Sequence, residues 1–75
     1  MTPEAVVASV FGRDATEIDD EASPSTIGEW DSLGHVTLVI ELESAYGVSF
    51  APEEVMALTS VAAIKRTLRA HGARW

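Results

Sequence analysis

Apolar residues near the start of the chain recur at helical spacing and predict a helix over residues 3–11. Thr2-Pro3-Glu4 supplies the usual start of a helix: a capping hydroxyl, a proline at the first position and an acid in the first turn. Gly12 is a plausible stop. The residues that form the apolar face of this helix are Val6, Val7, Val10 and Phe11.

A second and longer helix is predicted from the cap residue Asp31 to about Tyr46, with Gly47 ending it. Its apolar residues fall on two sides. The longer stripe, expected to face the core, holds Leu38, Val39, Leu42 and Tyr46, flanked by His35 and Ala45. The shorter stripe holds Leu33, Val36 and Ile40. We expect the shorter stripe to be partly exposed; the alternative is that it packs under the preceding loop.

Two further helices complete the predicted fold. Pro52-Glu53-Glu54 starts a brief helix that runs to Ala57 or Leu58. Thr59 or Ser60 caps a fourth helix, which Gly72 closes. The apolar face of this last helix consists of Val61, Ile64 and Leu68. No alternating strand pattern and no repeat is visible. The expected fold is all-α: a small four-helix bundle with three longer helices and one short one.

The stretch between the first two helices, residues 13–31, is predicted to be a long loop. It is rich in acids, serine and threonine and contains Pro24 and Gly28. Loops of this length are uncommon in small domains and are often functional. Ile18, Ile27 and Trp30 should pin it to the core. A calcium-binding EF-hand loop is excluded, because Ile18 stands where an oxygen ligand is required.

Length and charge narrow the class of protein. Seventy-five residues indicate one domain, 1–75, with a thin core. The absence of cysteine fits a reducing compartment, and the first residues resemble neither a signal peptide nor a membrane span, so we expect a free-standing cytoplasmic monomer. The net charge of −7 disfavours nucleic acid and favours basic partner surfaces. The basic residues of the fourth helix are expected to form a solvated helix end.

Enzymatic and metal chemistry find little support in the residues. Ser32 and His35 lie three residues apart, but a hydrolase also needs an orienting group and an oxyanion hole, and Trp30 replaces the first glycine of the nucleophile-elbow pattern. His35 should instead pack at the edge of the core face. His35 and His71 lie on separate helices with no third ligand suggested, which argues against a metal site. We therefore expect a protein that is not an enzyme.

Ser32 has the features of an attachment point. The first turn of a helix presents free backbone N–H groups and the positive end of the helix dipole, so a phosphate ester at Ser32 would be stabilised. Its side chain should project outward, and Gly34 should leave room for a close approach. The serine need not be reactive by itself if a transferring enzyme supplies the base.

With the apolar helix that follows it, Asp31-Ser32-Leu33 resembles the D-S-L motif of the acyl carrier protein family. The resemblance covers nearly the whole chain. It implies that Ser32 receives 4′-phosphopantetheine from coenzyme A through a separate phosphopantetheinyl transferase, and that the thiol of this arm holds acyl groups as thioesters. Asp31 belongs to the motif, and the surface for loading and downstream enzymes is expected to consist of Leu33, Val36, Thr37 and Ile40.

Departures from the family pattern suggest a specialised role. Carriers of bacterial fatty acid synthesis have an acid-rich D-S-L helix, whereas this one has only Glu41 and Glu43 after Asp31. The G-G-x-S pattern of peptidyl carriers is absent. The run W-D-S-L-G-H resembles discrete carriers of specialised, polyketide-like pathways, and residues 31–48 also resemble D-alanyl carriers. The cargo stays open between acyl and aminoacyl groups. The alternative function is a helical interaction module without a prosthetic group.

Overall fold

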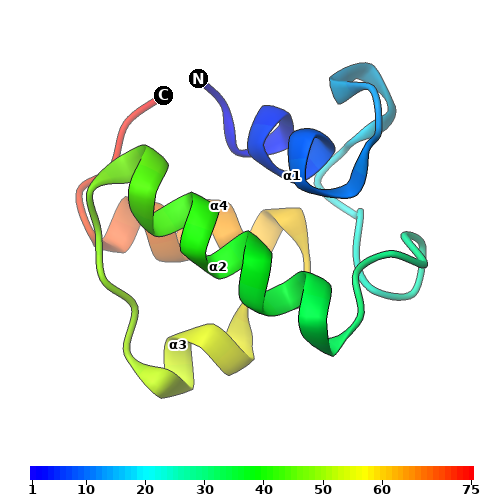
Figure 1. Ribbon diagram of the computed structural model, residues 1–75. Coiled ribbons are helices and arrows are strands. Elements are labelled where there is room, and N and C mark those ends of the chain that lie inside the picture. Colours follow the sequence, from blue (N-terminus) through cyan, green and yellow to red (C-terminus); the bar gives the residue numbers. More distant parts are fainter.

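The computed structural model describes all 75 residues, and its regular structure is entirely helical. The long helix α2 crosses the middle of the molecule, with the short helix α3 at its lower edge in the view of Figure 1. Helix α1 packs against both α2 and α4. The predicted all-α fold of three longer helices and one short helix is confirmed. The four helices are α1 (Pro3–Phe11), α2 (Ser32–Tyr46), α3 (Pro52–Ala57) and α4 (Val61–Ala70).

The helix ends follow the local capping signals. The hydroxyl oxygen of Thr2 accepts a hydrogen bond from the amide of Ala5, which starts α1. Gly12 and Gly47 end α1 and α2 in the left-handed conformation, with φ of 66° and 64°, where glycine carries no steric cost. Of the two candidate caps for α4, Ser60 is the one used: its hydroxyl oxygen accepts from the amide of Ala63.

The loop between α1 and α2 is held to the core as predicted, with Ile18, Ile27 and Trp30 all buried. It also contains a short 3₁₀ helix, η1 (Ala15–Glu17), which sequence reasoning did not identify. Two backbone hydrogen bonds join the middle of the loop to the start of α4, from Val61 to Ala22 and from Ala62 to Asp20. These contacts explain how an irregular segment of this length keeps one path.

A cluster of sixteen buried apolar residues from α1, α2, α4, the loop and the α2–α3 and α3–α4 connections forms the core. On α2, Leu38, Val39 and Leu42 are buried as predicted. Tyr46 was expected to belong to the core, but it is only half-buried and packs at the edge. Its ring lies 6.1 Å from the ring of Trp75, and its hydroxyl lies 3.4 Å from the carbonyl oxygen of Met1. Both ends of the described chain therefore meet the end of α2.

The expectation that the basic residues of α4 form a solvated helix end is wrong for Lys65. Its ammonium group lies 2.6 Å from a carboxylate oxygen of Glu4 on α1 and 2.6 Å from one of Asp20 in the loop. The Lys65 side chain is only 16% exposed. These two contacts join three segments of the chain. None of the helices has the length and apolar character that crossing a bilayer would require.

Candidate functional site

Ser32 occupies the first position of α2, directly after its cap. Asp31 has extended backbone angles, and its carboxylate accepts a hydrogen bond of 2.8 Å from the amide of Gly34. The carbonyl of Asp31 accepts the amide of His35. The side chain of Asp31 therefore fixes where the helix begins, and with it the direction in which Ser32 leaves the surface.

The hydroxyl of Ser32 is exposed and has no hydrogen-bond partner within the protein. The amides of Ser32 and Leu33 also donate to no protein acceptor. Two free N–H groups at the positive end of a fifteen-residue helix favour a negatively charged group beside them. The residues present therefore fit a phosphodiester on the oxygen of Ser32.

His35 has a role that the sequence did not reveal. The indole N–H of Trp30 donates to its Nδ1 at 2.9 Å, and its Nε2 lies 2.7 Å from the carbonyl oxygen of Val55. Because an indole N–H can only donate, Nδ1 is the unprotonated nitrogen and Nε2–H donates to Val55. His35 thus ties the loop, α2 and α3 together and does not merely pack at the core edge. Both ring nitrogens are occupied, so His35 is not placed to act as a base for Ser32.

Gly34 also differs from its predicted role. A Cβ atom at this position would lie 2.3 Å from the carbonyl oxygen of Glu29 and 2.9 Å from Cε1 of Phe11. The close approach that glycine permits is therefore that of the loop and α1, and not that of an external enzyme. Its effect on the site is indirect: it lets the residues before Ser32 lie directly against α2.

An open groove of about 560 Å³ runs beside Ser32. The loop contributes Pro24 and Trp30, whereas Met56, Leu58 and Thr59 come from the end of α3 and the residues that follow it. Sequence reasoning did not connect these last residues with Ser32, because nothing local indicates that α3 would lie against this end of α2. The His35–Val55 hydrogen bond joins α3 to α2 at this end, and Leu58, which follows α3, is buried in the core. An elongated group attached to Ser32 has this groove available to it.

The shorter apolar stripe of α2 is exposed, so the alternative that it packs under the loop is wrong. The exposed fractions are 77% for Leu33, 54% for Val36 and 57% for Ile40. Thr37 is exposed as well. Met56 on α3, at 80%, adds an apolar side chain on the rim of the groove beside Ser32. Exposed apolar side chains concentrated on one helix mark an interaction surface more often than a solvent face.

The acids around the site differ in how they are engaged. Glu29 lies 2.7 Å from the guanidinium of Arg13, and this hydrogen bond lowers the pKa of its carboxyl group. Glu43 on α2 accepts the amide of Phe50 at 2.8 Å. Glu54 on α3 accepts the amide of Ala51 and contacts His71, and these hydrogen bonds lower its pKa. The two histidines thus have separate partners: Trp30 and Val55 for His35, and Glu54 for His71.

Residues 4–68 match a family described as "Phosphopantetheine attachment site". An acyl carrier protein of Rubrobacter xylanophilus is 38% identical over 58 residues, which cover 77% of this chain and 72% of that protein. The solution structure of a holo acyl carrier protein from Geobacter metallireducens superimposes with a TM-score of 0.73 at 28% identity, covering 96% of this chain and 88% of that one.

Proposed function

This chain belongs to the phosphopantetheine-attachment family of acyl carrier proteins, and from that membership we propose that Ser32 is the residue that bears its 4′-phosphopantetheine. The protein is a carrier and not an enzyme. The alternative function, a helical interaction module without a prosthetic group, is therefore rejected. The observation that supports Ser32 is its place in the structure: an exposed hydroxyl at the first position of α2, beside two free amides.

The residues around Ser32 position the hydroxyl and stabilise the phosphate, whereas the transferase supplies the base. Asp31 fixes the start of the helix, and the amides of Ser32 and Leu33 stabilise the phosphate charge once it is in place. No base contacts the Ser32 hydroxyl, so the phosphopantetheinyl transferase must remove its proton. The arm, when bound, supplies a terminal thiol that holds the cargo as a thioester. The groove lined by Met56, Leu58 and Thr59 is where this protein can shelter the arm.

The exposed stripe of α2 is proposed as the surface that partner enzymes recognise. Leu33, Val36 and Ile40 supply apolar contact area, and Thr37 lies among them on the same helix. Apolar contacts of this kind act mainly on the dissociation rate, while the net charge of −7 speeds encounter with basic partners. The partners comprise the transferase and the enzymes that load and use the cargo.

The cargo is proposed to be an acyl group of a specialised, polyketide-like pathway. Both relatives described above are acyl carrier proteins, which favours an acyl over an aminoacyl cargo. The specialised role is supported by the small number of acids on α2, where Glu43 is engaged with the chain's own backbone and Glu41 is the only other one. A cytoplasmic location follows from the proposal, because the arm is drawn from coenzyme A.

The test is the intact mass of the protein after incubation with coenzyme A, magnesium and a broad-specificity phosphopantetheinyl transferase. The wild type should gain one phosphopantetheinyl group. Ser32→Ala should keep the apo mass and its helical circular dichroism, whereas Ser25→Ala, which removes an exposed loop hydroxyl, should be modified like the wild type. Modification of Ser32→Ala, or a wild type that several transferases all fail to modify, would overturn the proposal.

A further inference from the structure

Helix α3 forms one wall of the groove beside Ser32, yet it is attached to the other helices through few contacts. None of its six residues is buried. Two hydrogen-bonded contacts join it to other helices: the carbonyl oxygen of Val55 to His35 on α2, and the carboxylate of Glu54 to His71 at the end of α4. Both contacts therefore depend on a histidine, the side chain that changes its charge near neutral pH.

The contact at the Ser32 end requires His35 to be neutral. Trp30 is only 2% exposed, and the single acceptor of its indole N–H is Nδ1 of His35, at 2.9 Å. A proton on Nδ1 would set two N–H donors against each other and leave the buried indole N–H without a partner, which is unfavourable. Phe11 stacks on the Trp30 ring with centroids 5.6 Å apart and fixes it in place. A protonated His35 must therefore move away from Trp30.

The contact at the other end of α3 has the opposite pH dependence. Nε2 of His71 lies 3.0 Å and 2.9 Å from the two carboxylate oxygens of Glu54, and a positive charge on His71 strengthens such a contact. Hydrogen bonds from the amide of Ala51 and then from His71 lower the pKa of Glu54, so the carboxylate stays ionised in mild acid. Acid therefore weakens the attachment of α3 to α2 and preserves its attachment to α4.

We propose that His35 is a positioning residue for the modification of Ser32, an inference that rests on the carrier function proposed above. Neutral His35 holds α3 beside Ser32, so that Met56 and Thr59 complete the groove next to the serine hydroxyl. Protonated His35 releases this end of α3, and the groove loses one of its walls. Attachment at Ser32 is therefore slower in mild acid than at pH 7.5.

Few other charges face His35. The loop contributes Asp31, the cap of α2, which is the one other charged side chain that lines the groove. On α3, Glu54 is paired with His71 of α4, and Glu53 is exposed to solvent. No residue of α1 lines the groove. The remaining side chains that line it carry no charge: Pro24, Trp30, Ser32, Met56, Leu58 and Thr59.

The first test follows the ¹H–¹⁵N NMR spectrum of the unmodified full-length protein from pH 7.5 to pH 5. The indole N–H of Trp30 and the amides of Val55 and Met56 should shift together in one transition. The indole of Trp75 is the control, because its ring contacts Tyr46 and no histidine. A Trp30 indole signal that does not change while His35 is protonated would overturn the inference.

Two matched variants assign the transition to one histidine. His35→Gln should abolish it, because a glutamine amide can accept from Trp30 and donate to Val55 but does not titrate. His71→Gln removes the other histidine and should leave the transition at Trp30 in place. Loss of the transition in His71→Gln, or its persistence in His35→Gln, would contradict the proposal.

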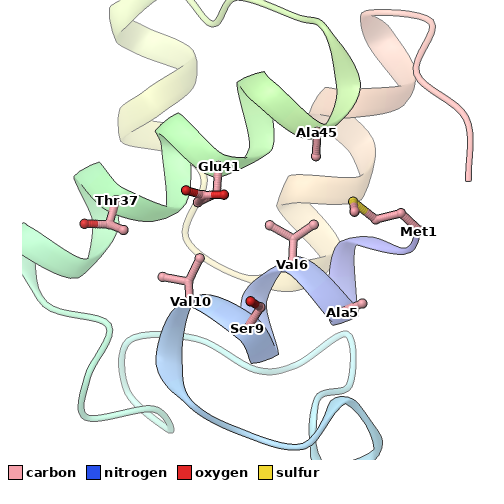
Figure 2. Close-up of a pocket in the computed structure, with 8 residues that line it drawn as sticks. All are labelled: Met1, Ala5, Val6, Ser9, Val10, Thr37, Glu41 and Ala45. Carbon is pink, nitrogen blue, oxygen red and sulfur yellow. The ribbon is translucent and has the colours of Figure 1, made fainter.

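The cleft between α1 and α2 provides an internal reference. It has a volume of about 300 Å³, and Figure 2 shows Ser9 and Val10 of α1 on one side and Thr37 and Glu41 of α2 on the other. No residue of α3 lines this cleft, so the amides of Ser9 and Val10 should not follow the transition of Trp30. Shifts of equal size at these amides would mean that acid loosens the whole molecule, and the inference would fail.

The second test is the rate of conversion to holo mass at pH 7.5 and pH 5.5. Each rate is divided by that of His35→Gln under the same conditions, because this ratio cancels the pH dependence of the transferase itself. The ratio for the wild type should fall about fivefold on acidification, the effect of one hydrogen bond of ordinary strength. The ratio for His71→Gln should fall likewise. A ratio that is equal at both pH values would overturn the inference. The NMR test does not require Ser32 to be modified, so its failure is distinguishable from failure of the mass experiment.

Discussion

At the scale of single residues, the turn that leads into α2 and presents Ser32 depends on Gly34, which is closely surrounded by other atoms. Gly34 lies inside a helix, where glycine is less favourable than alanine by about 1 kcal/mol. The carbonyl of Glu29 and the ring of Phe11 occupy the space that a Cβ atom would need. The lower helix propensity of glycine is offset because the loop and α1 can pack directly against the first turn of α2.

Gly34→Ala should therefore destabilise the protein, in the opposite direction to helix propensity. A contact of 2.3 Å with backbone cannot be relieved by a side-chain rotation, so we expect a loss of ~1–3 kcal/mol in the free energy of unfolding. Urea denaturation followed by circular dichroism measures it. Gly28→Ala is the matched control, because nothing lies within 4 Å of its Cβ position. Gly34→Ala at or above wild-type stability would show that the corner is not tightly packed.

At the scale of elements, α2 has two apolar faces, one packed in the core and the other exposed to solvent. Leu38 and Leu42 are fully buried, whereas Val36 and Ile40, on the other side, are more than half exposed. A helix that is apolar all round would normally be buried on every side. Because the molecule is small, no other element covers the second face. This exposed face is the surface that we propose for partner enzymes.

Leu42→Ala and Ile40→Ala test this division on one helix. Removing Leu42, which is 0% exposed, should cost ~2–5 kcal/mol in the free energy of unfolding through lost burial and a cavity. Ile40→Ala should cost less than ~1 kcal/mol, since most of its side chain is already in water. Ile40→Ala should nevertheless slow modification by the transferase, measured as the rate of conversion to holo mass. Equal destabilisation by both variants would mean that both faces are buried in solution.

At the scale of the whole molecule, Lys65 connects α4 to the acidic loop and to α1. The acids are concentrated in the loop, where Arg13 pairs with Glu29, and Lys65 of α4 contacts Asp20 in the loop and Glu4 on α1. The hydrogen bond to Asp20, followed by the one to Glu4, raises the pKa of Lys65 above its ordinary value of 10.5. This double contact connects α4 to two segments that are more than forty residues away in sequence.

The sign of the pKa shift sets the pH dependence of this contact. Because the pKa is raised on folding, its stabilisation is fully present below pH 10.5 and is lost as the pH rises through the folded pKa. We expect Lys65→Met to unfold at a lower temperature than the wild type at pH 7, with the difference shrinking above pH 10.5. Calorimetry or thermal circular dichroism from pH 7 to 11.5 measures it.

Burial, and after it the negative charge of Glu4, raises the pKa of Tyr46 above the usual 10.0. Because Glu4 is also a partner of Lys65, the wild type and Lys65→Met are compared in a Tyr46→Phe background, which removes the tyrosine's ionisation from both. A difference that is absent at pH 7 would show that solvent already screens both contacts. A difference that does not change up to pH 11.5 would mean that lost packing of the lysine stem, and not its charge, is responsible.

The sequence by itself determined the four helices and the position of Ser32 at the start of α2. Capping residues such as Thr2 and Asp31, left-handed stops such as Gly47 and apolar periodicity act within one or two turns, so a single chain carries them in full. The same local signals predicted that Ser32 opens α2 and that the face with Val36 and Ile40 differs from the core face.

Only the tertiary structure decided which residues of different elements come into contact. Trp30, His35 and Val55 form one hydrogen-bonded chain, Lys65 joins Glu4 to Asp20, and the α1–α2 seam leaves Glu41 beside apolar walls without a partner. Each arrangement depends on how segments distant in sequence are packed, and no residue pattern within a turn or two carries that information. The role of Gly34 shows the limit most directly: the sequence places a glycine in the helix, but the atoms that require it belong to Glu29 and to α1.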